Sequence, residues 1–197
     1  MQFSDLPLDS NILKGVEALG FTSPTPVQEE SIPLLINEDR DLIGLAQTGT
    51  GKTAAFGLPM IQKIDVSKNI VQGLVIAPTR ELCVQISNDF KDFSKFVKGL
   101  SIATIYGGAS MDKQSREIRS GAQIVVATPG RLMDMMKRKM IKINSVSYVV
   151  LDEADEMLNM GFKEDIDGIL SHTPDEKSTW LFSATMPRDV EKISKSY

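Results

Sequence analysis

The sequence has very little of the residues that build disulfides and zinc sites. Cys83 is the only cysteine and His172 the only histidine among 197 residues, which excludes an intrachain disulfide and a Cys/His zinc cluster. No apolar run reaches the roughly 20 residues that a membrane-spanning helix needs. The first ten residues also lack the basic and then apolar pattern of a secretory signal. We therefore expect a protein of a reducing, cytoplasmic compartment with no membrane partner.

The chain also has no excess of positive charge. It contains 22 Lys and Arg against 26 Asp and Glu, which gives a net charge of −4 and a pI near 5.1. Domains that hold nucleic acid through a broad basic surface are basic overall. Any nucleic-acid binding must therefore depend on a few well-placed contacts.

The sequence pattern changes near residue 41. Residues 1–40 contain a helical apolar spacing over 8–19, a turn with two prolines and a second short helix. We expect them to form a lead-in that packs on the domain of residues 41–197. In that domain six short apolar runs alternate with amphipathic segments, the clearest of which predicts a helix over 80–97. This alternation predicts an α/β fold with a mostly parallel sheet, helices on both faces, and ligands at the carboxyl ends of the strands.

A glycine-rich segment, AQTGTGKT at residues 46–53, follows the first apolar run and precedes a helical pattern. It ends as a phosphate-binding P-loop does, although Ala46 stands where the general pattern has glycine. Gly49 and Gly51 let the backbone approach phosphate, Lys52 supplies positive charge, and Thr53 supplies a hydroxyl for Mg²⁺. The segment therefore predicts a nucleotide site.

Two acidic residues follow the apolar run at 148–151. A carboxylate at the tip of a buried strand is typical of the Mg²⁺-associated aspartate of P-loop enzymes, which here is Asp152. Glu153 is suited to orient or deprotonate a water that attacks the γ-phosphate. Lys52, Asp152 and Glu153 are thus the candidate catalytic residues. The pair of acidic residues favours hydrolysis over binding alone, and the chain lacks the N-K-x-D motif of GTPases and the phosphoacceptor site and lid of kinases.

Residues 152–155 spell DEAD, and the chain resembles the N-terminal RecA-like domain of DEAD-box ATP-dependent RNA helicases over nearly its whole length. Residues 20–28 with the upstream Phe3 are similar to the Q motif, and in this family Ala46 is the normal first residue of the P-loop. The segments at 78–82, 107–108, 128–131 and 183–185 are similar to motifs Ia, GG, Ib and III. The resemblance implies a RecA-like P-loop NTPase domain that binds ATP, Mg²⁺ and RNA.

The resemblance also implies roles for individual residues. The nucleotide-binding residues would be Phe3, Phe21, Thr25, Gln28, Ala46, Gln47, Thr48, Gly49, Thr50, Gly51, Lys52 and Thr53, with Gln28 reading the adenine edge and Phe3 packing on the base. Thr53 and Asp152 would hold Mg²⁺, directly or through water. The RNA backbone would contact Pro78, Thr79, Arg80, Gly107, Gly108, Thr128, Pro129, Gly130 and Arg131. Asp155, Ser183 and Thr185 would couple hydrolysis to RNA binding.

Family members continue with a second RecA-like domain that carries an arginine-bearing motif, and nothing similar occurs in these 197 residues. We therefore expect a monomeric domain that binds nucleotide weakly and has negligible turnover by itself. An ATP-gated RNA clamp with little turnover is the alternative function. We expect Cys83 and Trp180 to be structural, and His172 to lie in an exposed polar loop.

Overall fold

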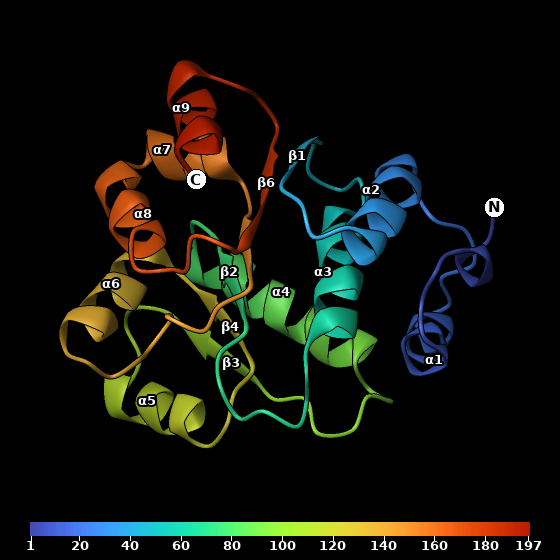
Figure 1. The fold of residues 1–197 in the computed structure, drawn as a ribbon, viewed down its shortest axis with the longest axis horizontal. Helices are drawn as coiled ribbons and strands as arrows, with labels where there is room; N and C mark the ends of the chain where they lie inside the picture. Colours follow the sequence, from blue (N-terminus) through green and yellow to red (C-terminus); the bar gives the residue numbers. More distant parts are fainter.

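Six parallel strands form one sheet at the centre of the computed structural model, which describes residues 1–197 (Figure 1). The strand order is β1-β6-β5-β2-β4-β3, and every neighbouring pair is parallel. The strands are β1 (Leu42–Leu45), β2 (Gly73–Ile76), β3 (Ile102–Ile105), β4 (Ile124–Ala127), β5 (Tyr148–Leu151) and β6 (Ser178–Ser183). The predicted mostly parallel α/β sheet is confirmed, and each of the six apolar runs forms one strand.

Helices cover both faces of the sheet (Figure 1). In chain order they are the 3-10 helix η1 (Phe3–Asp5), α1 (Ser10–Ala18), α2 (Pro26–Asn37), α3 (Lys52–Lys63), α4 (Arg80–Phe93), α5 (Met111–Arg119), α6 (Pro129–Lys137), α7 (Ala154–Asn159), α8 (Lys163–Leu170) and α9 (Arg188–Ser196). No helix combines the length and the apolar character that a bilayer crossing requires.

Side chains of the central strands alternate between two hydrophobic cores, because successive residues of a strand point to opposite faces. Along β2, Val75 joins the core under α1–α4, while Leu74 and Ile76 join the core under α5–α9. All four residues of β2 are buried, as is usual for a parallel sheet covered on both faces. The continuous apolar runs of the sequence therefore reflect burial from both sides.

The lead-in residues pack on the same domain. Phe3, Ile12 and Val16 belong to the core that also contains α3 and α4. Gly15 of α1 lies against the backbone of α4, where an added Cβ would collide with the Phe93 carbonyl oxygen. Phe3 and its neighbours are thereby held beside the carboxyl edge of the sheet.

The helix predicted over 80–97 ends earlier, at Phe93. The Ser94 hydroxyl donates a 2.7 Å hydrogen bond to the Phe90 carbonyl, which competes with the backbone pattern of a continuing helix. Val97 still packs against the core, although it lies after the end of the helix. The apolar spacing therefore identified the buried residues correctly but placed the end of the helix too late.

Candidate functional site

A cleft of about 500 Å³ lies at the carboxyl edge of the sheet, between the lead-in and the P-loop. It brings together residues predicted as nucleotide-binding and residues predicted as catalytic, which are far apart in the sequence. The predicted residues that line it are Phe3, Phe21, Thr25, Gln28, Thr48, Gly49, Gly51, Lys52, Thr53, Asp152 and Glu153. Ala46, Gln47 and Thr50 line a neighbouring depression between α2 and β1 instead.

The P-loop has the backbone that its sequence predicts. Gly49 and Gly51 have φ angles of +81° and +82°, a conformation that strongly favours glycine. Ala46 continues the sheet ladder, because its N–H donates a 3.0 Å hydrogen bond to the Ser183 carbonyl. It has no positive φ angle, so a Cβ at this position is tolerated.

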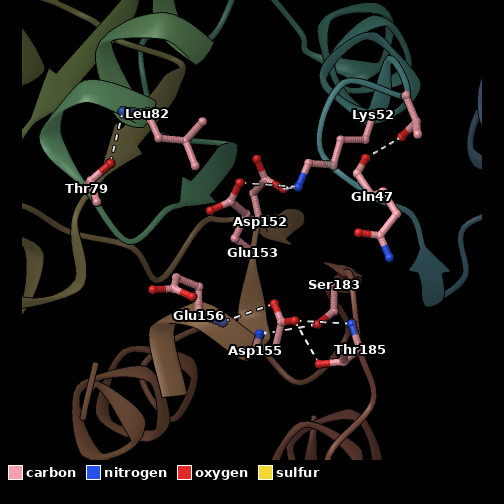
Figure 2. A network of polar contacts seen from close by, with 11 residues as sticks. Gln47, Lys52, Thr79, Leu82, Asp152, Glu153, Asp155, Glu156, Ser183 and Thr185 are labelled. Carbon is pink, nitrogen blue, oxygen red and sulfur yellow. Dashed lines mark hydrogen bonds and ion pairs between the residues drawn. The ribbon is translucent and has the colours of Figure 1, made fainter. Parts of the chain in front are cut away.

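Lys52 begins α3 and faces the two acidic residues that follow β5 (Figure 2). Its Nζ lies 3.1 Å from Asp152 Oδ1 and 3.6 Å from Glu153 Oε1. Apart from its ion pair with Lys52, the fully buried Asp152 carboxylate has no side-chain hydrogen-bond partner on either oxygen. Burial raises the pKa of Asp152 above its ordinary value, and the attraction of Lys52 offsets only part of this effect. A buried carboxylate with this free acceptor capacity is suited to coordinate a cation.

Glu153 has a left-handed backbone, with φ at 53° and ψ at 51°. For a residue other than glycine this conformation costs about 1–2 kcal/mol, and such strain is concentrated at functional sites. Glu153 is the residue before the first turn of α7, and its side chain is only partly buried. The strained turn therefore keeps a partly accessible carboxylate at the cleft, beside Lys52.

Gln28 joins the lead-in to the P-loop. Its Oε1 accepts a 3.0 Å hydrogen bond from the Thr25 N–H, and its Nε2 donates a 2.9 Å hydrogen bond to the Gly51 carbonyl. A carboxamide can make four hydrogen bonds, so one acceptor and one donor site of Gln28 remain. That pair of sites matches the N6 donor and N7 acceptor of an adenine edge.

Two aromatic side chains line the same end of the cleft. The rings of Phe3 and Phe21 are stacked, with their centroids 6.3 Å apart. Phe3 is 3% exposed and Phe21 is 43% exposed. Phe21 therefore presents more apolar surface to a ligand than Phe3, the residue to which the resemblance assigns the contact with the base.

Asp155 connects the DEAD segment to the end of β6 (Figure 2). Its Oδ2 accepts hydrogen bonds from the Thr185 hydroxyl at 2.8 Å and the Thr185 N–H at 3.1 Å. The Asp155 N–H donates to the Ser183 hydroxyl at 3.2 Å. Burial works to raise the pKa of Asp155, but the hydrogen bonds from Thr185 and Ser183 outweigh it and keep the pKa below its ordinary value.

The three strand-to-helix turns predicted to contact RNA lie side by side. β2 and β3 both pair with β4, so Ile76, Ala127 and Ile105 end neighbouring strands in register. The exposed residues of these turns are Arg80, Gly107, Gly108 and Gly130, and Pro78 and Pro129 are buried.

Two of the predicted RNA residues have structural contacts within the domain. The Thr79 hydroxyl accepts a 3.2 Å hydrogen bond from the Leu82 N–H and so caps α4 (Figure 2). The Arg131 Nη1 donates to the Ala109 carbonyl at 3.0 Å and to Gln114 Oε1 at 3.1 Å.

Comparison with known proteins identifies the family. The family model of the DEAD/DEAH box helicases matches residues 25–193, which is most of the chain. The chain belongs to the DEAD/DEAH box helicase family. Its fold is correspondingly that of a RecA-like helicase domain.

Several helicases of this family are similar to the whole chain. The DEAD-box ATP-dependent RNA helicase CshA of Streptococcus pneumoniae is 50% identical over 197 residues, which are 100% of this chain and 37% of that protein. The ATP-dependent RNA helicase DeaD of Escherichia coli is 49% identical over 195 residues, which are 99% of this chain and 31% of that protein. The chain therefore spans about a third of the length of these relatives.

A solved structure has the same fold. The crystal structure of a DEAD box protein from the hyperthermophile Methanococcus jannaschii superposes with a TM-score of 0.96 at 40% sequence identity. The match covers 100% of this chain and 53% of that one.

Sequence reasoning missed one wall of the cleft in this DEAD-box domain. Residues from one side of α4 line it: Leu82, Gln85, Asp89, Asp92 and Phe93. Burial, and secondarily the charge of Asp92, raise the pKa of Asp89 above its ordinary value. The spacing of 82, 85, 89 and 92 marks one helix face. This polar stripe lies beside the apolar face at 82, 86, 90 and 93, which dominates the sequence pattern of the helix.

The residues expected to be structural have no place in the cleft. Cys83 is buried in the core and its pKa is raised to about 12, mainly by burial. Trp180 is also buried, and its indole N–H donates to the Arg40 carbonyl at 3.2 Å. His172 is exposed, as its polar surroundings in the sequence indicated.

Proposed function

We propose that this chain is the ATP-binding half of a DEAD-box RNA helicase. The observation that carries the proposal is the cleft in which Gln28, Lys52 and the adjacent pair Asp152 and Glu153 converge from three distant parts of the sequence. The cleft would bind ATP and the neighbouring turns would bind the RNA backbone. In the longer protein a second RecA-like domain would complete the site and couple hydrolysis to local unwinding of an RNA duplex.

Adenine would bind between Gln28 and the ring of Phe21. The two free hydrogen-bonding sites of Gln28 support bidentate pairing with adenine, because guanine presents acceptors at both positions of its corresponding edge. The N–H groups of the P-loop and the N-terminus of α3 would bind the phosphates, with Lys52 neutralising charge.

Asp152 and Thr53 are the residues that would hold Mg²⁺. The free acceptor capacity of the buried Asp152 carboxylate supports this assignment. No group of three or more acidic, His or Cys side chains forms a metal cage in the chain. This fits Mg²⁺, which is usually held by one or two carboxylates together with substrate phosphates and water, and which would neutralise phosphate charge here.

Glu153 would orient or deprotonate the attacking water. Its partly exposed carboxylate at the cleft, held there by a strained backbone, favours turnover over the alternative of a clamp. Substituting Glu153→Gln in the longer protein separates the two functions. Loss of biological function together with RNA-stimulated ATPase and unwinding supports the helicase, whereas biological function that is retained without hydrolysis would support the clamp.

The isolated chain would bind nucleotide weakly and hydrolyse it negligibly. An arginine supplied to the γ-phosphate contributes about 10³–10⁵ in rate in other NTPases, and the second domain would provide it here. RNA would be bound through its backbone without sequence preference, by a monomeric domain. A cytoplasmic location fits a chain whose single cysteine is free and buried.

The binding of nucleotide tests the proposal directly. In a competition assay against a fluorescent ADP analogue, ATP should displace the probe better than GTP does. Gln28→Ala should reduce this preference toward unity. Gln62→Ala is the matched control, because Gln62 also bonds to backbone, at Pro7 and Asp9, but lies outside the cleft. An unchanged ATP preference in Gln28→Ala would refute the adenine assignment.

A further inference from the structure

We propose that Tyr106 and Gln114, which lie outside every motif described above, are positioning residues for RNA binding. They join the three predicted RNA-binding turns into one unit. The inference rests on the proposed function, because it concerns how those turns hold an RNA backbone. Neither residue is proposed to touch the nucleotide or the RNA itself.

Gln114 fixes the turn that contains Gly107 and Gly108 through hydrogen bonds of its buried side chain. It is 5% exposed, and its Nε2 donates a 3.0 Å hydrogen bond to the Tyr106 carbonyl. Its Oε1 accepts from Arg131, which also donates to the Ala109 carbonyl. The carbonyls on both sides of Gly107 and Gly108 are thus fixed by one network, and that network begins at the Arg131 turn.

The two glycines between these fixed points are free to bind a ligand. Both are exposed, and neither of their N–H groups donates a hydrogen bond within the chain. Exposed backbone N–H groups in a turn bind phosphate well when their orientation is set in advance. Gln114 and Arg131 set that orientation without occupying the N–H groups themselves.

Tyr106 extends the network to the third turn through its side chain. The Arg80 guanidinium carbon lies 4.7 Å from the centroid of the Tyr106 ring. The Tyr106 ring is therefore the side chain against which the Arg80 guanidinium packs. A Cβ at Gly108 would lie 4.0 Å from Arg80 Nη1, which places the arginine beside the glycine turn. Arg80 therefore lies beside the turn that carries the free N–H groups.

Arg131 has a positioning role in this network. Its Nη1 donates to two acceptors inside the domain and fixes the turn at 106–109, while the guanidinium keeps further N–H donors for an RNA phosphate. Gln114 connects Arg131 to the Tyr106 carbonyl, and the Tyr106 ring in turn packs against Arg80.

The test is a titration of the ¹⁵N-labelled chain with a single-stranded oligouridylate, followed by the amide signals of Gly107 and Gly108. Gln114→Met removes both polar contacts of Gln114 at similar length, and Tyr106→Leu removes the ring. Each should weaken RNA binding about five- to tenfold, while the dissociation constant for ADP stays unchanged. Gln114→Met should also lower the heteronuclear NOE of the two glycines, and Tyr106→Phe, which keeps the ring, should restore wild-type affinity.

Two further variants separate the possible outcomes, one a matched control and one a probe of the RNA surface. Gln62→Met removes two similar hydrogen bonds to backbone far from the turns and should bind RNA as the wild type does. Arg80→Ala should weaken RNA binding whether or not Tyr106 positions the Arg80 side chain. If Arg80→Ala weakens binding but Gln114→Met and Tyr106→Leu behave like Gln62→Met, the positioning role is refuted and the proposed RNA surface stands. If the wild type does not bind RNA, or Arg80→Ala binds it unchanged, the proposed RNA surface fails and this inference fails with it.

Discussion

Substitution of Gly51 by alanine should damage both the stability of the domain and its choice of base. Gly51 has a φ angle of +82°, and an added Cβ would collide with Gln28 Nε2. The same Cβ would lie 3.1 Å from Thr25 Oγ1 and 3.2 Å from Thr25 Cγ2. The Gln28 amide must therefore move, which breaks its hydrogen bonds to Gly51 and Thr25.

Gly49 provides a matched control for this substitution. Its φ angle is +81°, but nothing lies within 4 Å of an added Cβ. Both alanine variants carry the left-handed backbone cost of about 1–2 kcal/mol. Only Gly51→Ala also loses the two hydrogen bonds of Gln28, which contribute about 0.5–1.5 kcal/mol each. The free energy of unfolding should therefore be about 1–3 kcal/mol lower in Gly51→Ala than in Gly49→Ala.

Urea denaturation measures this difference, and competition of ATP and GTP for a fluorescent ADP analogue measures the base preference. Both variants should bind nucleotide less tightly, because both change the phosphate loop. Only Gly51→Ala should lose the preference for ATP, since a bidentate contact to a base gives about 1–3 kcal/mol of discrimination. Equal stabilities and equal ATP-to-GTP ratios in the two variants would refute the proposed coupling of Gln28 to the P-loop.

Two further predictions concern Asp155 and Cys83. Because the folded pKa of Asp155 is lowered, its contribution to stability is present at neutral pH and is lost as the pH falls below the ordinary carboxyl value of 3.8. Thr185→Val should therefore lower the free energy of unfolding more at pH 7 than at pH 2.5, and a difference of equal size at both values would contradict the assignment. Burial raises the pKa of Cys83 to about 12, so a thiol reagent at pH 8 should label the folded chain only as it unfolds. Labelling at the rate of a free thiol would show that Cys83 is accessible.

The sequence predicted the sheet and the phosphate site well, because both follow from local rules. Apolar runs in a parallel sheet are buried on both faces, and the spacing of Gly49, Gly51 and Lys52 reflects the geometry of one loop. The DEAD segment was assigned from its place after an apolar run. The structure brings Asp152 within 3.1 Å of Lys52, and these two residues are 100 positions apart.

The remaining features depend on tertiary contacts that have no local signature. Gln114 looks like an ordinary polar residue of an amphipathic helix, and its burial against the Tyr106 carbonyl follows only from the packing of α5 on β3. The left-handed backbone of Glu153 is equally unpredictable, because glutamate has no preference for it. Glu153 adopts a conformation that its sequence does not favour, because the surrounding fold imposes it.

Lys52 is the residue on which phosphate binding in the cleft depends most directly. Calorimetric titration of the chain with ADP and ATP in the presence of Mg²⁺ measures this role. Wild type and Lys63→Ala, a control in which a lysine of the same helix loses its ion pair with Asp39, should bind both nucleotides. Lys52→Ala should give no measurable binding while it remains folded. An unchanged affinity for ATP in Lys52→Ala would contradict the assignment of this cleft as the nucleotide site.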